Sequence, residues 1–275
     1  MQSGLKQRIL TAVVLGLALL AVILWLPPEA ALVVFACVVL VGAWEWSTFP
    51  RFPAAAARWF YVLIVGLAMF LVWRFSQNEQ QLQTLLLLAL GWWIVAFLWI
   101  SLAPGSHNRA TVAGSGLLVL VPAWVAIAHL YLQPGDGLAT RGPQLVLFLL
   151  LLVWAADTGA FFAGRRFGRI KLAPRVSPSK TWEGVLGGLA AAVAVAAVGA
   201  WWFHLRRVAF LSLCLAVVLI SIVGDLTESM FKRYAGVKDS GSIFPGHGGV
   251  LDRIDSITAA APTFLLGLRW MEAQS

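Results

Sequence analysis

Apolar residues fill the chain in long runs, separated by short segments that carry charge, proline or glycine. Each run is close to the roughly 20 residues that an α-helix needs to cross a hydrocarbon core about 30 Å thick. Lipid offers no hydrogen bonds to an exposed backbone, so these runs are expected to be helical. The pattern predicts helices at about 9–26, 29–46, 58–75, 82–103, 112–132, 144–164, 184–203, 208–231 and 254–271. The predicted fold class is therefore an all-α polytopic membrane protein with about nine transmembrane helices.

Composition supports this interpretation. Of the 275 residues, 60% are apolar and 12% are charged, and the mean hydropathy is +0.85, which argues against a soluble domain. The first run follows Lys6 and Arg8 as a signal peptide would, but Pro27-Pro28 follows it in place of a small-residue cleavage site, so it is interpreted as a membrane anchor. Two cysteines within apolar runs allow neither a disulfide framework nor a cysteine metal site.

The distribution of basic residues predicts the orientation. When the nine helices alternate across the membrane, 15 of the 20 Lys and Arg residues fall on the side of the N-terminus. The positive-inside rule then places the N-terminus in the cytoplasm and the C-terminus outside. Basic loops beside anionic headgroups also account for the net charge of +8, so membrane lipids are the expected partners and nucleic acid is not.

The chain is expected to be a single integrated domain with a division of labour. Residues 1–143 carry few ionisable groups within their helices and are interpreted as a transmembrane scaffold. Residues 144–275 contain nearly all the acids that lie within or beside helices, together with two long polar segments, and are interpreted as catalytic helices with cytoplasmic loops.

Carboxylates on membrane helices are informative because each costs at least about 2.5 kcal/mol by insertion scales. Each one is therefore a candidate for a functional site. The acids in this position are Glu45, Asp157, Asp225, Glu228, Asp252 and Asp255. Glu45 lies between two tryptophans and is interpreted as an acid at the membrane interface, where tryptophans gather.

Two helices carry these acids in pairs. Asp225 and Glu228 are three residues apart, as are Asp252 and Asp255, so each pair projects from one helical face. Four carboxylates near the cytoplasmic interface would repel one another unless cations neutralised them, and hard oxygen ligands suit Mg²⁺. Two metal ions about 3.5–4 Å apart could clamp a phosphoryl-type displacement. The alternative is that the acids pair with neighbouring basic side chains and hold the helices together.

The segment between the two pairs predicts a phosphate site. Lys232, Arg233 and Lys238 are cationic donors for phosphate. Gly248 and Gly249 belong to a glycine-rich turn whose backbone could approach a ligand closely. The turn leads directly into the last helix, whose N-terminus favours an anion. A P-loop motif is missing from the sequence, which excludes a soluble-type NTPase.

A second polar loop reads Ser-Pro-Ser-Lys-Thr-Trp-Glu-Gly from residue 177, after a basic run. Its hydroxyl and ammonium groups could contact phosphate, although a basic loop beside anionic lipid would carry the same charge. The candidate phosphate donors are Ser177, Ser179, Lys180 and Thr181. Glu183 is a candidate either to cap the next helix or to reach a metal.

The run from residue 229 to 255 closely resembles the signature of bacterial phosphatidate cytidylyltransferases. The signature positions are filled by Ser229, Lys232, Arg233, Lys238, Asp239, Pro245, Gly246, His247, Gly248, Gly249, Asp252, Arg253 and Asp255. Gly224-Asp225, the loop from residue 177, the segment Asp157-Thr-Gly-Ala-Phe-Phe-Ala-Gly and Gly42-Ala-Trp-Glu-Trp also resemble family segments. The resemblance extends along the chain and is sharpest after residue 150.

This resemblance implies a polytopic homodimer in the bacterial inner membrane, with its active site facing the cytoplasm. The implied reaction transfers CMP from CTP to phosphatidic acid and gives CDP-diacylglycerol and pyrophosphate for phospholipid biosynthesis. The resemblance implies Mg²⁺ dependence, with Asp225 and Asp252 as metal ligands and K⁺ as a candidate second ion.

The remaining roles follow from these assignments. Asp255 and Glu228 are expected to support the metal, and Lys232 is expected to act on the reacting phosphates. Asp157 is assigned to substrate binding. His247 is a candidate general base or phosphate donor, although a lone loop histidine is more often structural and phosphatidate, already anionic, needs little deprotonation.

Two other functions compete with this prediction. An ion-coupled transporter would also use intramembrane acids, but it would place them near the membrane midplane and would not need the Gly-His-Gly-Gly turn. The CDP-alcohol phosphotransferases also use paired membrane aspartates with Mg²⁺, but their D-G-x2-A-R-x8-G-x3-D-x3-D pattern is missing from the sequence.

Overall fold

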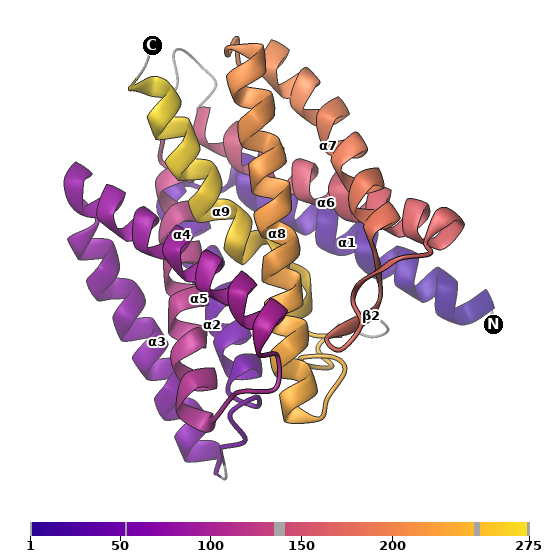
Figure 1. The fold of residues 1–275 in the computed structure, drawn as a ribbon. Helices are drawn as coiled ribbons and strands as arrows, with labels where there is room; N and C mark the ends of the chain where they lie inside the picture. Colours follow the sequence, from indigo (N-terminus) through magenta and orange to yellow (C-terminus); the bar gives the residue numbers. More distant parts are fainter. Residues whose placement is uncertain (1, 53, 135–140, 245–247, 274–275) are drawn as a thin grey trace. The chain divides into compact units, whose positions relative to one another are not determined.

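The computed structural model describes residues 2–52, 54–134, 141–244 and 248–273, with side chains described from residue 13 onward. Within these ranges the chain forms nine helices and one short hairpin (Figure 1). The helices are α1 (Gln2–Trp25), α2 (Pro28–Trp46), α3 (Ala55–Phe75), α4 (Glu79–Leu102), α5 (Arg109–Tyr131), α6 (Arg141–Phe167), α7 (Trp182–Trp202), α8 (Arg207–Ala235) and α9 (Leu251–Glu272). Each overlaps one predicted helix, so the all-α polytopic fold is confirmed.

Seven of these helices, α2 to α8, are long and apolar enough to cross a membrane by length and composition. The described apolar part of α1, Val13–Trp25, is shorter. α9 lies outside the seven and begins with a charged first turn that includes Asp252 and Arg253. Most of its later residues are buried, among them Phe264 and Leu265 with 0% exposure. The inside-to-outside orientation stays a prediction.

The polar loop from residue 177 contains secondary structure that the sequence pattern did not predict. β1 (Lys171–Ala173) pairs antiparallel with β2 (Ser177–Thr181), with Lys171 opposite Thr181. β1 has three residues and β2 has five, most of them polar in β2, so neither strand shows the alternation of apolar and polar residues over four to eight positions that marks a strand in sequence.

The chain divides into two compact units that interleave along the sequence. Unit 1 comprises Met1–Arg74, His107–Leu147 and Phe231–Ile254. Unit 2 comprises Phe75–Ser106, Phe148–Met230 and Asp255–Ser275. The predicted division of labour between residues 1–143 and 144–275 concerns function and stays a prediction.

Unit 1 is held by hydrogen bonds from aromatic side chains to backbone carbonyls of neighbouring helices. Trp46 Nε1 donates to the carbonyl of Val112 at 2.9 Å, which joins α2 to α5. The hydroxyl of Tyr61 in α3 donates to the carbonyl of Ala113 at 3.0 Å. These bonds matter because lipid cannot stabilise helix contacts by the hydrophobic effect, so packing and hydrogen bonds must do so.

Unit 2 packs through small residues. Gly159 of α6 lies against the backbone of Gly187 in α7, where an added Cβ would come within 2.6 Å of the Gly187 carbonyl oxygen. Gly224 of α8 lies equally close to α9, since a Cβ there would be 2.8 Å from the carbonyl oxygen of Asp255. Such close backbone approach is typical of helix pairs in membranes. It brings Gly224, the residue before Asp225, against Asp255 and Ala259 of α9.

Candidate active site

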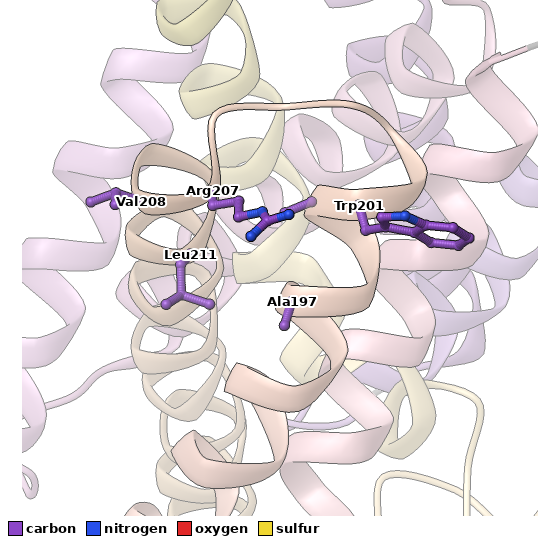
Figure 2. A pocket seen from close by; sticks show the side chains of 6 residues that line it. Ala197, Trp201, Arg207, Val208 and Leu211 are labelled. Carbon is purple, nitrogen blue, oxygen red and sulfur yellow. The ribbon is translucent and has the colours of Figure 1, made fainter.

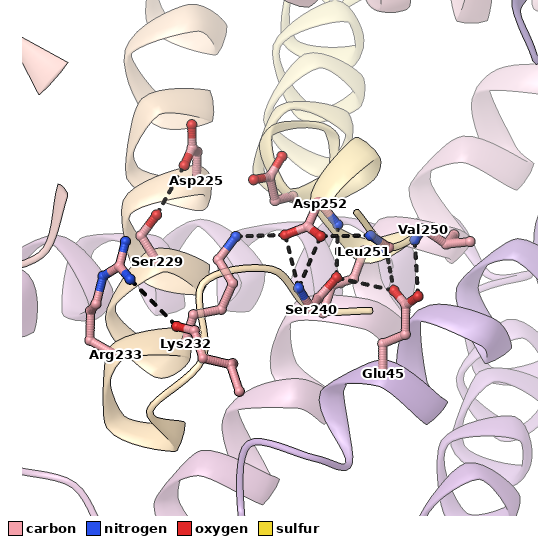
Figure 3. Close-up of polar contacts among 12 residues, drawn as sticks. Glu45, Asp225, Ser229, Lys232, Arg233, Ser240, Val250, Leu251 and Asp252 are labelled. Carbon is pink, nitrogen blue, oxygen red and sulfur yellow. Dashed lines mark hydrogen bonds and ion pairs between the residues drawn. The ribbon is translucent and has the colours of Figure 1, made fainter. Parts of the chain in front are cut away.

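The predicted site residues fall into two groups, one in each unit. In unit 2, Asp225 of α8 forms an ion pair with Lys180 of β2, with Nζ and Oδ2 2.6 Å apart. Both side chains are about one quarter exposed, at 26% and 27%. Ser229, one turn further along α8, donates a hydrogen bond to Asp225 Oδ1 at 3.3 Å (Figure 3). The hairpin thus brings a cation to an acid that the sequence assigned to metal binding.

The hairpin is fixed to the start of α7 by its own side chains. Thr181 caps α7, because its hydroxyl oxygen accepts a hydrogen bond from the N–H of Gly184 at 3.2 Å. Both carboxylate oxygens of Glu183 accept from the N–H of Ile170 at 3.2 Å. Glu183 therefore ties the entry of the hairpin to α7. Of the predicted serine donors, Ser177 is buried and Ser179 is exposed.

Three further predicted acids lie in unit 2. Glu228 is almost fully buried in α8, with 2% exposure. Asp255 lies in the early part of α9, where its Oδ1 accepts a hydrogen bond from the N–H of Ser256 at 2.7 Å. Asp157 lies exposed on α6. Gly224 packs directly against the carbonyl of Asp255, so α8 and α9 present their acids from two helices in close contact.

In unit 1, Asp252 is the centre of a polar network at the start of α9 (Figure 3). Lys232 of α8 lies 2.7 Å from Asp252 Oδ1 and is buried, with 8% exposure. The backbone N–H of Ser240 donates to Asp252 Oδ2 at 2.9 Å, and that of Gly249 donates to the same atom at 2.7 Å. Three donors from separate segments therefore fix this carboxylate.

The same contacts determine the pKa of Asp252. Burial by itself raises the pKa of the carboxyl group, but the hydrogen bonds and charge of Lys232 and the N–H groups of Gly249 and Ser240 outweigh it. The pKa of Asp252 is therefore lower than that of an ordinary aspartate. The group is an anion at neutral pH, as both an ion pair and a metal ligand require.

The glycine-rich turn makes room for carboxylates of the protein itself. Gly248 has a φ of +82°, and an added Cβ would lie 2.6 Å from Asp252 Oδ2. A Cβ on Gly249 would lie 2.5 Å from both carboxylate oxygens of Glu45. The sequence pattern predicts that this turn and the N-terminus of α9 receive a ligand anion. In the structure, Glu45 and Asp252 accept the hydrogen bonds of these N–H groups.

Glu45 has contacts that the sequence pattern does not predict. The pattern indicates an acid at the membrane interface, and the structure adds that this side chain is buried, with 3% exposure. Its carboxylate accepts hydrogen bonds from the N–H groups of Val250 and Leu251 at 3.1 and 2.7 Å. The signal in the sequence is the cost of a carboxylate in an apolar helix, which calls for such hydrogen-bond donors.

The remaining cationic candidates are exposed. Arg233 lies exposed in the last turn of α8, and Lys238 lies exposed in the segment that follows α8, so both are accessible to a charged ligand. This segment begins where Gly236, with a φ of +79°, ends α8 in the manner of a helix C-cap. His247 lies outside the described residues.

Comparison with known proteins identifies the family. The model of the Cytidylyltransferase family matches residues 6–271. A phosphatidate cytidylyltransferase of Haemophilus influenzae is 41% identical over 280 residues, covering 94% of this chain and 97% of the relative. One of Pseudomonas aeruginosa is 45% identical over 268 residues, covering 94% and 95%. One of Brucella suis is 36% identical over 288 residues, covering 96% and 93%. The chain belongs to the cytidylyltransferase family.

Membership confirms the resemblance seen in the sequence. The cytidylyltransferase is an enzyme that transfers a nucleotidyl group. Seven long apolar helices among its described residues make it a multi-pass membrane protein, and its relatives are bacterial. Nothing in the family or its relatives supports the transporter alternative.

The expected convergence of four carboxylates on a metal is not seen in the described part of this cytidylyltransferase. Among those residues, no group of three or more His, Cys, Asp or Glu side chains could hold a metal ion. Asp225 and Asp252 instead each lie against a lysine. The donor set still suits a hard divalent cation, because the acids on α8 and α9 offer carboxylate oxygens. The metal ligands stay a prediction.

A cavity in unit 2 of the cytidylyltransferase lies far from Asp225. It has a volume of about 340 Å³ and lies at the α7–α8 turn, lined by Ala197, Ala200, Trp201, Arg207, Val208 and Leu211 (Figure 2). Arg207 begins α8, whereas Asp225 lies 18 residues later, which corresponds to about 27 Å along a helix. This apolar cavity therefore plays no part in the site chemistry.

Proposed function

We propose that the protein is a phosphatidate cytidylyltransferase, which transfers CMP from CTP to phosphatidic acid and releases pyrophosphate. The match of the family model from residue 6 to 271 carries this proposal. The names of the relatives support it, as do the two pairs of an aspartate with a lysine, Lys180–Asp225 and Lys232–Asp252.

In the proposed reaction, a phosphate oxygen of phosphatidate attacks the α-phosphorus of CTP. A new phosphoanhydride bond forms, the bond from the α-phosphorus to the bridging oxygen breaks, and pyrophosphate leaves with the electron pair. Negative charge grows on the leaving group, so catalysis depends on positioning and on preorganised cations. Lys180 and Lys232 are proposed to supply these cations near the acids, and the exposed Arg233 and Lys238 to bind phosphates.

Asp225 and Asp252 are proposed to hold a divalent metal, Mg²⁺, with Glu228 and Asp255 as supporting groups and K⁺ as a candidate second ion. When bound, the metal would neutralise triphosphate charge. Support for this assignment comes from the oxygen donor set and from the approach of α8 to α9 at Gly224. In the structure a lysine ammonium already balances each aspartate, so these sites accept positive charge.

The polar loops are proposed to bind the two substrates. Ser179 is exposed beside Lys180 and is suited to phosphate contact. Thr181 and Ser177 are proposed to act through the shape of the hairpin, since the Thr181 hydroxyl caps α7. Gly248 and Gly249 are proposed to shape the turn beside CTP, His247 to contact phosphate, and Asp157 to contact substrate.

The proposed location is the bacterial inner membrane, with the site facing the cytoplasm, where CTP is made. The distribution of basic residues supports this orientation. Acyl chains of phosphatidate would remain in the surrounding lipid. Resemblance to the family favours a homodimer, and the mass of the purified protein in detergent, measured by light scattering, tests that assembly.

The reaction is tested directly with purified protein, phosphatidic acid, Mg²⁺ and each nucleoside triphosphate in turn. Pyrophosphate release is expected with CTP and lipid together, and it is expected to stop when either is omitted or the metal is chelated. Release without lipid, or equal release with ATP, would contradict the proposal.

Replacing either central aspartate tests the metal ligands. Asp225→Asn and Asp252→Asn should each lower CTP-dependent formation of CDP-diacylglycerol to background, while the variant remains inserted in the membrane. Glu79→Gln is a matched control, because it breaks a carboxylate–guanidinium pair with Arg269 in unit 2 outside the proposed site. Near-normal turnover in both aspartate variants would contradict the assignment of Asp225 and Asp252 as metal ligands.

A further inference from the structure

Glu45 carries a charge that the proposed reaction does not use. It lies at the end of α2 with 3% exposure, and a buried carboxylate is costly unless it is well hydrogen-bonded. Three donors satisfy it: the N–H of Val250 at 3.1 Å, the N–H of Leu251 at 2.7 Å and the hydroxyl of Ser240 at 3.2 Å. The carboxylate thus binds the start of α9 and the preceding loop together.

Two glycines leave room for this carboxylate. An added Cβ at Gly249 would lie 2.5 Å from both Glu45 oxygens. An added Cβ at Gly241 would come well inside contact distance of Glu45 Oε1. Side chains at these positions would push the carboxylate out, so the loop and Glu45 fit each other closely.

Ser240 connects Glu45 to Asp252. Its hydroxyl donates to Glu45 and accepts from the N–H of Asp252 at 3.3 Å. Its own N–H donates to the Asp252 carboxylate at 2.9 Å. A shift of Glu45 would therefore move the loop that supplies one of the donors fixing Asp252 (Figure 3).

We propose that Glu45 is a positioning residue for the cytidylyltransferase reaction, which fixes Ser240 and the start of α9 and, through them, the Asp252 carboxylate. The inference rests on the proposed function. Glu45 also accepts the hydrogen bonds of the Val250 and Leu251 N–H groups, which directs substrate phosphates to the lysine and arginine side chains instead.

The test compares Glu45→Gln with Glu29→Gln, an exposed glutamate on the same helix. Glutamine keeps the shape but turns an NH₂ group toward a backbone or hydroxyl donor, so one donor loses its acceptor. Glu45→Gln should lower kcat/KM for CTP by roughly 10- to 100-fold, as loss of a group that supports a metal ligand does, while KM for phosphatidic acid is unchanged. Glu29→Gln should stay within about twofold, because an exposed polar change has little effect.

Hydrogen exchange gives a second measurement that does not depend on activity. In wild-type protein, amides of residues 240–244 and 248–252 should exchange slowly, and in Glu45→Gln they should exchange faster while those of α3 are unchanged. Ser240→Ala should reproduce both effects, and the double variant should be less than additive, because both side chains act through one network.

These measurements separate the inference from the proposed function. Unchanged kcat/KM for CTP per folded molecule in Glu45→Gln and in Ser240→Ala would overturn the inference, even if stability fell. A wild-type protein without CTP-dependent turnover would instead contradict the proposed function, and unchanged exchange in residues 240–244 and 248–252 would then still overturn the inference.

Discussion

At the scale of single residues, the two aspartates expected to bind metal each lie against a lysine. Lys180 and Asp225 are partly exposed, whereas Lys232 and Asp252 are 10% and 7% exposed in their side chains. Breaking the more buried pair would leave an uncompensated charge and should cost more than breaking the other. Lys180 is therefore the lysine whose role can be tested with less damage to folding.

Lys180→Ala should raise the KM for CTP or phosphatidate by roughly tenfold, the effect of losing one charged hydrogen bond. The KM should rise because the variant lacks the cation beside Asp225. Kinetics at saturating and limiting concentrations of each substrate measure the effect.

Lys171→Ala is the control for this prediction, because Lys171 lies exposed on the neighbouring strand. Its KM values should match those of the wild type. If the two substitutions had equally small effects on KM, the hairpin would not bind substrate. Its basic residues would then serve only to orient the protein in the membrane.

At the scale of elements, close packing of α8 on α9 depends on Gly224. Gly224→Ala should destabilise the protein by about 1–3 kcal/mol, the range for forcing an extra methyl group into a filled contact, since its Cβ would lie 2.8 Å from a backbone oxygen. Activity should fall with stability because Asp225 is the next residue. Thermal unfolding in mild detergent measures the change.

Gly91→Ala in α4 is the matched substitution, because nothing lies within 4 Å of a Cβ placed there. Alanine favours a helix over glycine by about 0.5–1 kcal/mol, so this variant should be as stable as the wild type or more so. If Gly224→Ala were equally harmless, α8 and α9 would not pack closely at this position.

At the scale of the whole molecule, the positive-inside pattern predicts which loops face the cytoplasm. After Cys37 and Cys214 are replaced by alanine, Lys238→Cys and Arg206→Cys each present one exposed thiol. A membrane-impermeant maleimide should label Lys238→Cys only in inside-out vesicles and Arg206→Cys only in right-side-out vesicles. The reverse labelling would contradict the N-in orientation and the proposed cytoplasmic site.

The sequence alone determined the membrane helices and the family. An apolar run of about 20 residues in lipid must satisfy its own backbone hydrogen bonds, which it does as an α-helix. Each predicted helix therefore overlaps an observed one. The motif residues between Ser229 and Asp255 have a fixed spacing, and this spacing indicates the family. The strands β1 and β2 were not predicted, because strands of three and five residues are too short to show a distinctive pattern.

Only the tertiary structure decided how the charges are used. Glu45 and Glu29 lie on the same helix. Glu45 is buried and accepts hydrogen bonds from three donors, whereas Glu29 is exposed. The donors of Glu45 come from residues about 200 positions later in the chain. Local sequence specifies which side chains carry charge, but the free energy of a buried charge depends on partners that folding brings from elsewhere.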